Sequence, residues 1–200
     1  MNHNKTVERR ELIIDDIVLM ICECGLPRSI IYKKSFNKFL KHVYVENITK
    51  TEIESGITKR SEIILNDIYF FLSNSVCNSL CVDEWTNTIS NSVINFTVIN
   101  DKGEAFLVDS IDNALERNTA KRLSDLTHSV ISTLKENGVN ITGLITDNCN
   151  TMKALKSELC LISSEYRSII KVGCCCHILA IMLKRISNID YIHFALDIVY

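Results

Sequence analysis

The sequence predicts an α/β protein in which a mixed sheet follows an N-terminal layer of helices. Up to about residue 76 the apolar residues recur at helical spacing, whereas residues 92–99 alternate apolar and polar side chains as a strand does. After three consecutive strand-like segments, helical and strand-like segments alternate. Because short turns join antiparallel strands and helices join parallel ones, the sheet should contain both kinds of pair.

The N-terminal region is expected to contain three helices. The first covers Glu8 to Cys24 and ends at residues 25–27, Gly-Leu-Pro, a glycine stop followed by proline. The second covers Ile30 to Val45, with apolar side chains on one face and lysines on the other. The third runs from about Ile57 to Leu72, and we assign residues 1–76 to this helical region.

The following elements are expected in the order strand, strand, strand, helix, strand, helix, strand, helix. They cover Ser79–Asp83, Ser92–Ile99, Ala105–Val108, Glu116–Asn137, Val139–Thr146, Asn150–Leu159, Ile169–Gly173 and Cys176–Ile186. The last helix should pack Leu179, Leu183 and Ile186 inward. This order resembles that of the ribonuclease H-like fold, in which the fourth strand lies beside the first and parallel to it. We assign residues 77–190 to such a core.

The composition limits the partners that this chain can have. With 22 basic and 24 acidic residues, its formal charge of −2 is unlike that of a free-standing DNA-binding module, so any nucleic-acid affinity must be local. The nine cysteines lack the spacing of a disulfide framework, and we interpret them as reduced thiols. No apolar run approaches the ~20 residues of a membrane helix, so we expect no membrane partner.

Two aspartates close strands of the expected sheet. Asp83 ends the first strand and Asp147 follows the fourth, and the ribonuclease H-like arrangement would bring them to one edge. Paired carboxylates repel each other, and a divalent cation such as Mg²⁺ or Mn²⁺ relieves the repulsion. Such ions activate water and stabilise the leaving oxygen in nucleases and polymerases. The alternative is that Asp83 is a turn residue and Asp147 a helix N-cap.

Four motifs in register resemble those of hAT-family transposases and the related DUF659 domain. Residues 81–86 resemble an Asp-x-Trp-Thr motif, residues 95–99 the strand that follows it, residues 144–150 a Thr-Asp-Asn-Ala-x-Asn block, and residues 171–183 a Cys-x-x-His-x-Leu-Asn-Leu block. The resemblance extends from about Ile13 to Ile186. Departures from the motifs are Glu84 in place of a small residue, Cys149 in place of Ala and Ala180 in place of Asn.

The resemblance implies a nuclear cut-and-paste DNA transposase whose ribonuclease H-like domain binds Mg²⁺ through an Asp, Asp, Glu triad. Water attacks the DNA at the element's end, the freed hydroxyl attacks the opposite strand to leave a hairpin on the flanking DNA, and the element end is joined to the target. Asp83 matches the first carboxylate and Asp147 the second. The glutamate is expected beyond a long helical insertion, of which residues 191–200 would be the truncated start.

We therefore expect a partial catalytic core that is inactive alone and binds Mg²⁺ or Mn²⁺ weakly, and whether this chain is itself an enzyme stays open. The implied partner is DNA at the transposon ends, and the implied oligomer forms through regions outside this chain. A non-catalytic DUF659-type module, derived from a transposase and binding DNA or a protein, is the alternative. A genomic reading frame that continues to a glutamate would favour the transposase.

Five residues are candidates for DNA contact: Trp85, Cys174, His177, Lys184 and Arg185. Trp85, the only tryptophan, could stack on a base near the cut or pack in the core. By resemblance, Cys174 and His177 hold the fixed positions of their block. His177 could donate a hydrogen bond to the DNA phosphate, which also makes it a candidate catalytic residue. Lys184 and Arg185 form a small basic cluster that fits a solvated helix face equally well.

The run Cys174-Cys175-Cys176 allows a further interpretation, a small metal or thiol protein built round these side chains. Adjacent residues point in different directions, so the three thiols cannot all face one ion. The sequence also gives no disulfide pattern that would indicate a redox role. Under the transposase interpretation, Cys175 and Cys176 are small apolar fillers.

Overall fold

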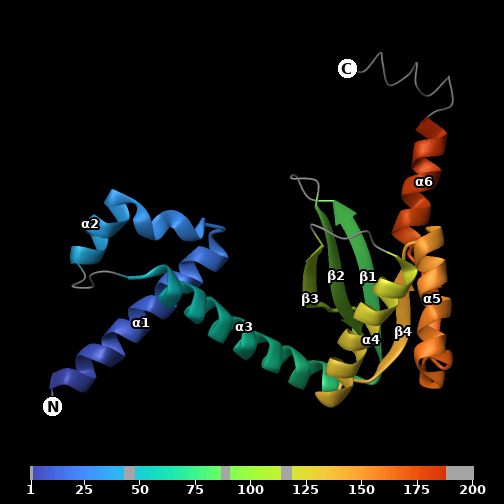
Figure 1. The fold of residues 1–200 in the computed structure, drawn as a ribbon, viewed down its shortest axis with the longest axis horizontal. Coiled ribbons are helices and arrows are strands. Elements are labelled where there is room, and N and C mark those ends of the chain that lie inside the picture. Colours follow the sequence, from blue (N-terminus) through green and yellow to red (C-terminus); the bar gives the residue numbers. More distant parts are fainter. Residues whose placement is uncertain (1, 43–47, 87–90, 114–118, 188–200) are drawn as a thin grey trace. The chain divides into compact units, whose positions relative to one another are not determined.

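The computed structural model describes residues 2–42, 48–86, 91–113 and 119–187. The chain divides into two compact units, Met1–Asn66 and Asp67–Tyr200, with the boundary inside helix α3 (Lys50–Ser73). Figure 1 shows the elements of each unit. Within the described ranges, no helix has the length and apolar character needed to span a membrane. The expected insertion at residues 191–200 lies outside the described residues.

The N-terminal unit has its own apolar core between α1 (Asn2–Glu23), α2 (Lys34–His42) and the first half of α3. Its buried residues are Ile17, Val18, Ile21, Ile31, Phe36, Leu40, Ile48 and Ile53. The prediction of one helix from Ile30 is wrong, because a 3₁₀ helix, η1 (Arg28–Tyr32), precedes α2. Lys33 donates its N–H to the Ile30 carbonyl and is itself extended (φ −74°, ψ 132°), which separates the two helices. The predicted end at Val45 lies outside the described residues.

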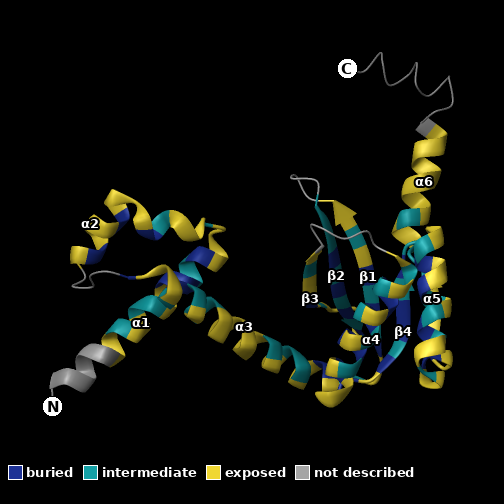
Figure 2. Ribbon diagram, viewed as in Figure 1, coloured by how far each residue is buried: buried dark blue, intermediate teal, exposed yellow. Residues whose placement is uncertain are grey.

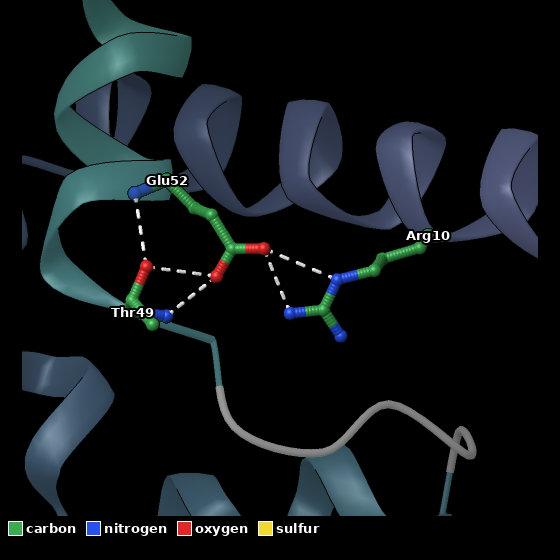
Figure 3. Close-up of polar contacts among 3 residues, drawn as sticks. All are labelled: Arg10, Thr49 and Glu52. Carbon is green, nitrogen blue, oxygen red and sulfur yellow. Dashed lines mark hydrogen bonds and ion pairs between the residues drawn. The ribbon is translucent and has the colours of Figure 1, made fainter.

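Helix α3 begins at Lys50, well before the predicted start at Ile57, because a capping box forms at its N-terminus. Thr49 Oγ1 accepts the Glu52 backbone N–H (3.2 Å), and Glu52 Oε2 accepts the backbone N–H (2.8 Å) and hydroxyl (2.9 Å) of Thr49 (Figure 3). Arg10 on α1 donates from Nε (3.1 Å) and Nη2 (2.8 Å) to Glu52 Oε1. The helix start is thereby bonded to α1.

The second unit is built on a five-stranded mixed sheet of order β3-β2-β1-β4-β5. The strands are β1 (Asn78–Thr86), β2 (Ser92–Asn100), β3 (Ala105–Asn113), β4 (Ile141–Thr146) and β5 (Ile170–Gly173). Pairs β1/β2 and β2/β3 are antiparallel, and pairs β1/β4 and β4/β5 are parallel. The predicted α/β class, with the ribonuclease H-like strand order and the fourth strand beside the first, is confirmed.

The core of this unit lies on one face of the sheet, beneath α4 (Ala120–Glu136) and α5 (Asn150–Ile162). The predicted alternation on β2 is confirmed, since Ile94, Phe96 and Val98 are all fully buried in this core. On the opposite face, Leu107 and Ile170 are exposed. The described part of the helix predicted from Glu116 begins at Ala120, and residues 114–118 lie outside the described ranges.

Helix α6 (Cys175–Ser187) follows β5 and is largely exposed (Figure 2). The prediction that Leu179, Leu183 and Ile186 pack inward is wrong, because their exposed fractions are 56%, 66% and 44%. These side chains recur at helical spacing, but none of them joins the core beneath α4 and α5. A short 3₁₀ helix, η2 (Ser164–Arg167), was not predicted and links α5 to β5.

Candidate functional site at the carboxyl edge of the sheet

The register of β1 and β4 determines where the two aspartates lie. Val82 on β1 and Thr146 on β4 are paired in parallel, and each is followed directly by an aspartate, Asp83 or Asp147. Paired residues of neighbouring parallel strands point to the same face, and such strands are ~4.8 Å apart. Val82 and Thr146 are buried under the helices, so Asp83, the next residue of β1, projects from the opposite face. The prediction that Asp83 ends its strand is wrong, because β1 continues to Thr86, whereas Asp147 is the first residue after β4. The two aspartates thus directly follow a pair of register partners at the same edge.

In the turn after β4, both the side chain and the backbone carbonyl of Asp147 accept hydrogen bonds. Asp147 Oδ1 accepts the backbone N–H of Cys149 (2.8 Å), and the Asp147 carbonyl accepts the hydroxyl of Thr146 (2.8 Å). The N-cap of α5 is Cys149, whose Sγ accepts the Met152 N–H (3.4 Å), so the alternative role of Asp147 as the helix N-cap is wrong. Burial, followed by the hydrogen bond with Asp147, raises the pKa of Cys149.

The junction of β5 and α6 lies at the same edge. Cys174 donates its backbone N–H to the Thr146 carbonyl (2.7 Å), and its own carbonyl accepts the Ile178 N–H (3.3 Å), so it directly precedes the first turn of α6. His177 lies in that turn and is half-buried. The structure therefore brings the Cys-x-x-His block to the strand end that carries Asp147.

The thiols near this edge do not form an activated cluster. Burial raises the pKa of Cys81, and Asp83, Cys174 and Cys176 add to the rise. The neighbouring Cys175 and Cys174 raise the pKa of Cys176. A raised pKa favours the thiol over the thiolate that binds metals or attacks disulfides. All nine cysteines are free, and no group of three or more His, Cys, Asp or Glu in the described ranges is placed to hold a metal ion.

The remaining residues predicted to contact DNA lie in two separate parts of the fold, on β1 and at the end of α6. Trp85 lies two residues beyond Asp83 on β1, hence on the same face, and is 47% exposed and outside the core. Lys184 and Arg185 are in the last turn of α6. At ~1.5 Å per residue they lie roughly 10 Å further along the helix than His177. The edge therefore gathers Asp83, Trp85, Asp147, Cys174 and His177, and the basic pair lies further out.

Lys156, a cation of α5 that reaches β5, was not predicted from the sequence. Its Nζ donates to the Val172 carbonyl (3.0 Å). Burial lowers the pKa of Lys156; the positive charge of Lys171 adds to this shift, and the negative charge of Asp147 opposes it. A lysine two turns into an ordinary amphipathic helix carries no local signal, so only the packing of α5 on the sheet reveals it.

The fold and this edge define a mixed α/β domain of the ribonuclease H-like type, with Asp83 on β1 and Asp147 directly after the adjacent parallel strand β4. The family model described as a domain of unknown function (DUF659) matches residues 72–199, which is more than half of the chain. This chain belongs to the DUF659 family, which is associated with hAT-type transposase-like proteins. No curated protein matches the chain.

Proposed function

We propose that this chain is part of the catalytic core of a hAT-like DNA transposase, which acts in the nucleus on transposon ends. The observation that carries the proposal is the register of β1 and β4, in which Asp83 and Asp147 each directly follow one of two paired residues, Val82 and Thr146. Membership of the DUF659 family supports it. So does the bond from Cys174 to Thr146, which brings His177 to the same edge.

The two aspartates fit a hard divalent cation. Carboxylate oxygens are the ligands that Mg²⁺ and Mn²⁺ prefer, and Asp83 is exposed while Asp147 is half-buried. A bound ion of this kind supplies the activation of water and the stabilisation of a leaving oxygen at phosphorus. Because no third acidic ligand joins them among the described residues, we propose weak binding and no DNA cleavage by this chain alone.

The other residues of the edge have roles in holding DNA. His177, half-buried in the first turn of α6, would donate a hydrogen bond to a phosphate oxygen. Trp85 offers an exposed ring on which a base can stack. Lys184 and Arg185, further along α6, would neutralise phosphates away from the cut. Oligomerisation would depend on protein outside this chain.

A Mn²⁺ titration followed by calorimetry tests the carboxylate pair. We expect Asp83→Asn and Asp147→Asn each to weaken Mn²⁺ binding by at least about tenfold, since each removes a charged ligand. Asp101→Asn is the matched control, because Asp101 lies in the turn after β2, at the opposite edge of the sheet. Equal Mn²⁺ affinities in the wild type and all three variants would refute the proposed site.

A further inference from the structure

Gly173, the last residue of β5, lies opposite Thr146 in the parallel pair β4/β5. The glycines with positive φ among the described residues are Gly25, Gly103 and Gly138. The backbone of Gly173 is therefore open to any L-residue, and a reason for glycine here has to be steric rather than conformational. The neighbour that sets this steric limit is Asn148.

The side chain of Asn148 fills the space that the side chain of any larger residue at position 173 would occupy. A Cβ atom built on Gly173 would lie 3.0 Å from Cγ and 3.1 Å from Nδ2 of Asn148, and closer still to its Oδ1. Such distances are too short for ordinary contacts, so Asn148 and a larger residue at 173 exclude each other. Asn148 follows Asp147 directly in the sequence, and Gly173 directly precedes Cys174.

The amide of Asn148 is held by packing rather than by hydrogen bonds from its nitrogen. Its Nδ2 is buried and has no hydrogen-bond partner among the described residues. A buried amide without a partner costs about 1–3 kcal/mol, so a side chain placed this way calls for an explanation. The close approach of Asn148 to Gly173 brings the turn after β4 against the end of β5.

We infer that Asn148 is a positioning residue for the proposed metal site: seated against Gly173, it holds the turn that carries Asp147 against the strand that leads to Cys174 and His177. This inference rests on the proposed function. The bond from Cys174 to the Thr146 carbonyl joins the same two segments through the backbone. Asn148 adds a side-chain contact to that bond, one residue beyond the aspartate.

The variants Asn148→Ala, Gly173→Ala and the double variant test the contact and the role together. In thermal unfolding, Gly173→Ala should be destabilised, and the double variant should recover most of that loss because the new methyl group fills the vacated space. In Mn²⁺ titration, Asn148→Ala and the double variant should both bind about ten- to hundredfold more weakly than the wild type, as for loss of an outer-shell contact. If the double variant regains stability but not Mn²⁺ affinity, Asn148 contributes to the metal site beyond its contribution to packing.

Gly143→Ala is the matched control. A Cβ at Gly143 would lie 3.1 Å from Ser79 Cβ, so this variant should also lose stability. Gly143 lies inside β4, before the end of the strand. The Gly143→Ala variant should therefore bind Mn²⁺ with the affinity of the wild type. If the wild type binds Mn²⁺ and Asn148→Ala binds it equally well, the positioning role of Asn148 is refuted while the proposed metal site stands. A wild-type chain that binds no Mn²⁺ would refute the proposed site and this role together.

Discussion

Val82 and Thr146 are register partners across the parallel pair β1/β4, and each is buried on the helix-covered face immediately before an aspartate. This pairing has a consequence for substitutions at the edge. A shift of β1 by one residue would turn Asp83 to the helix-covered face, because strand side chains alternate. The position of Asp83 in the proposed metal site and the core packing of β1 therefore depend on the same register.

The capping box at α3 gives the first prediction. Thr49→Ala removes the hydroxyl that accepts the Glu52 N–H, and we expect a loss of about 1 kcal/mol in the free energy of unfolding. Urea denaturation followed by circular dichroism measures it. Thr51→Ala, an exposed change in the same first turn, should be neutral or slightly stabilising because alanine favours helix. Equal losses in both variants would contradict the capping role.

The carboxylate of Glu52 predicts a dependence of stability on pH. Burial would raise its pKa, but the hydrogen bonds from Thr49 and Arg10 and the Arg10 charge together outweigh burial and lower it. A lowered pKa means that Glu52 stabilises the fold above the ordinary carboxyl value of about 4.3, and that this contribution is lost as the pH falls through the lowered value.

Unfolding curves of the wild type and Glu52→Gln between pH 7 and pH 3 test this dependence. The stability difference between them should be largest near pH 7 and should shrink as the pH falls below about 4.3. Glu62→Gln, an exposed change on the same helix, serves as the control. A difference between wild type and Glu52→Gln that is constant with pH would contradict the ionic contribution.

The charge of Lys156 should oppose cation binding at the edge. Lys156→Met removes an ammonium group within electrostatic range of Asp147, and we expect Mn²⁺ to bind about five times more tightly, the equivalent of roughly 1 kcal/mol. The same titration of Lys102→Met, a change in the turn after β2 at the opposite edge of the sheet, should leave the affinity as it is. Weaker binding by Lys156→Met would instead show that its bond to Val172 is needed to shape the site.

The exposed ring of Trp85 predicts a contribution to single-stranded DNA binding. Trp85→Ala should weaken the binding of a fluorescein-labelled oligonucleotide by about 1–3 kcal/mol, the usual value of one stacked base. Fluorescence anisotropy at low salt measures it, since phosphate contacts weaken as salt rises. Leu161→Ala, which removes an apolar side chain of α5 that is 77% exposed, should leave the affinity unchanged. Equal affinities for both variants would exclude stacking on Trp85.

Much of the sheet could be predicted because its signals are local. The alternation around Phe96 predicts a strand and its buried face. The apolar runs before Asp83 and Asp147 predict that both aspartates lie at one edge once the strand order is known, although β1 continues three residues past Asp83 to Thr86. The sequence also contains a signal for the start of α3, since Thr49-x-x-Glu52 is a capping-box pattern. The predicted start at Ile57 was wrong because apolar spacing marks the packed face of a helix, whereas the capping box marks where the helix begins.

The rest depends on contacts between segments that are distant in sequence. Lys33 interrupts a helix whose apolar spacing continues through it, and only the 3₁₀ bonds around it show the break. The contact of Asn148 with Gly173 joins the turn after β4 to the end of β5, and these two segments share no sequence pattern. Leu183 has the spacing of a packed residue but is exposed, because periodicity gives a face of the helix and not what covers it.

The pairing of β1 with β4 also sets an order of events in folding. Asn78 and Thr142, which contact each other at the start of this pair, are 64 residues apart, whereas the antiparallel pairs β1/β2 and β2/β3 join strands that are consecutive in the chain. Closing a long chain segment costs more entropy than closing a hairpin, so the parallel pair should form after the hairpins. During refolding, Mn²⁺ binding should therefore appear later than the hairpin signal, and the two aspartates would report on the final closure of the sheet.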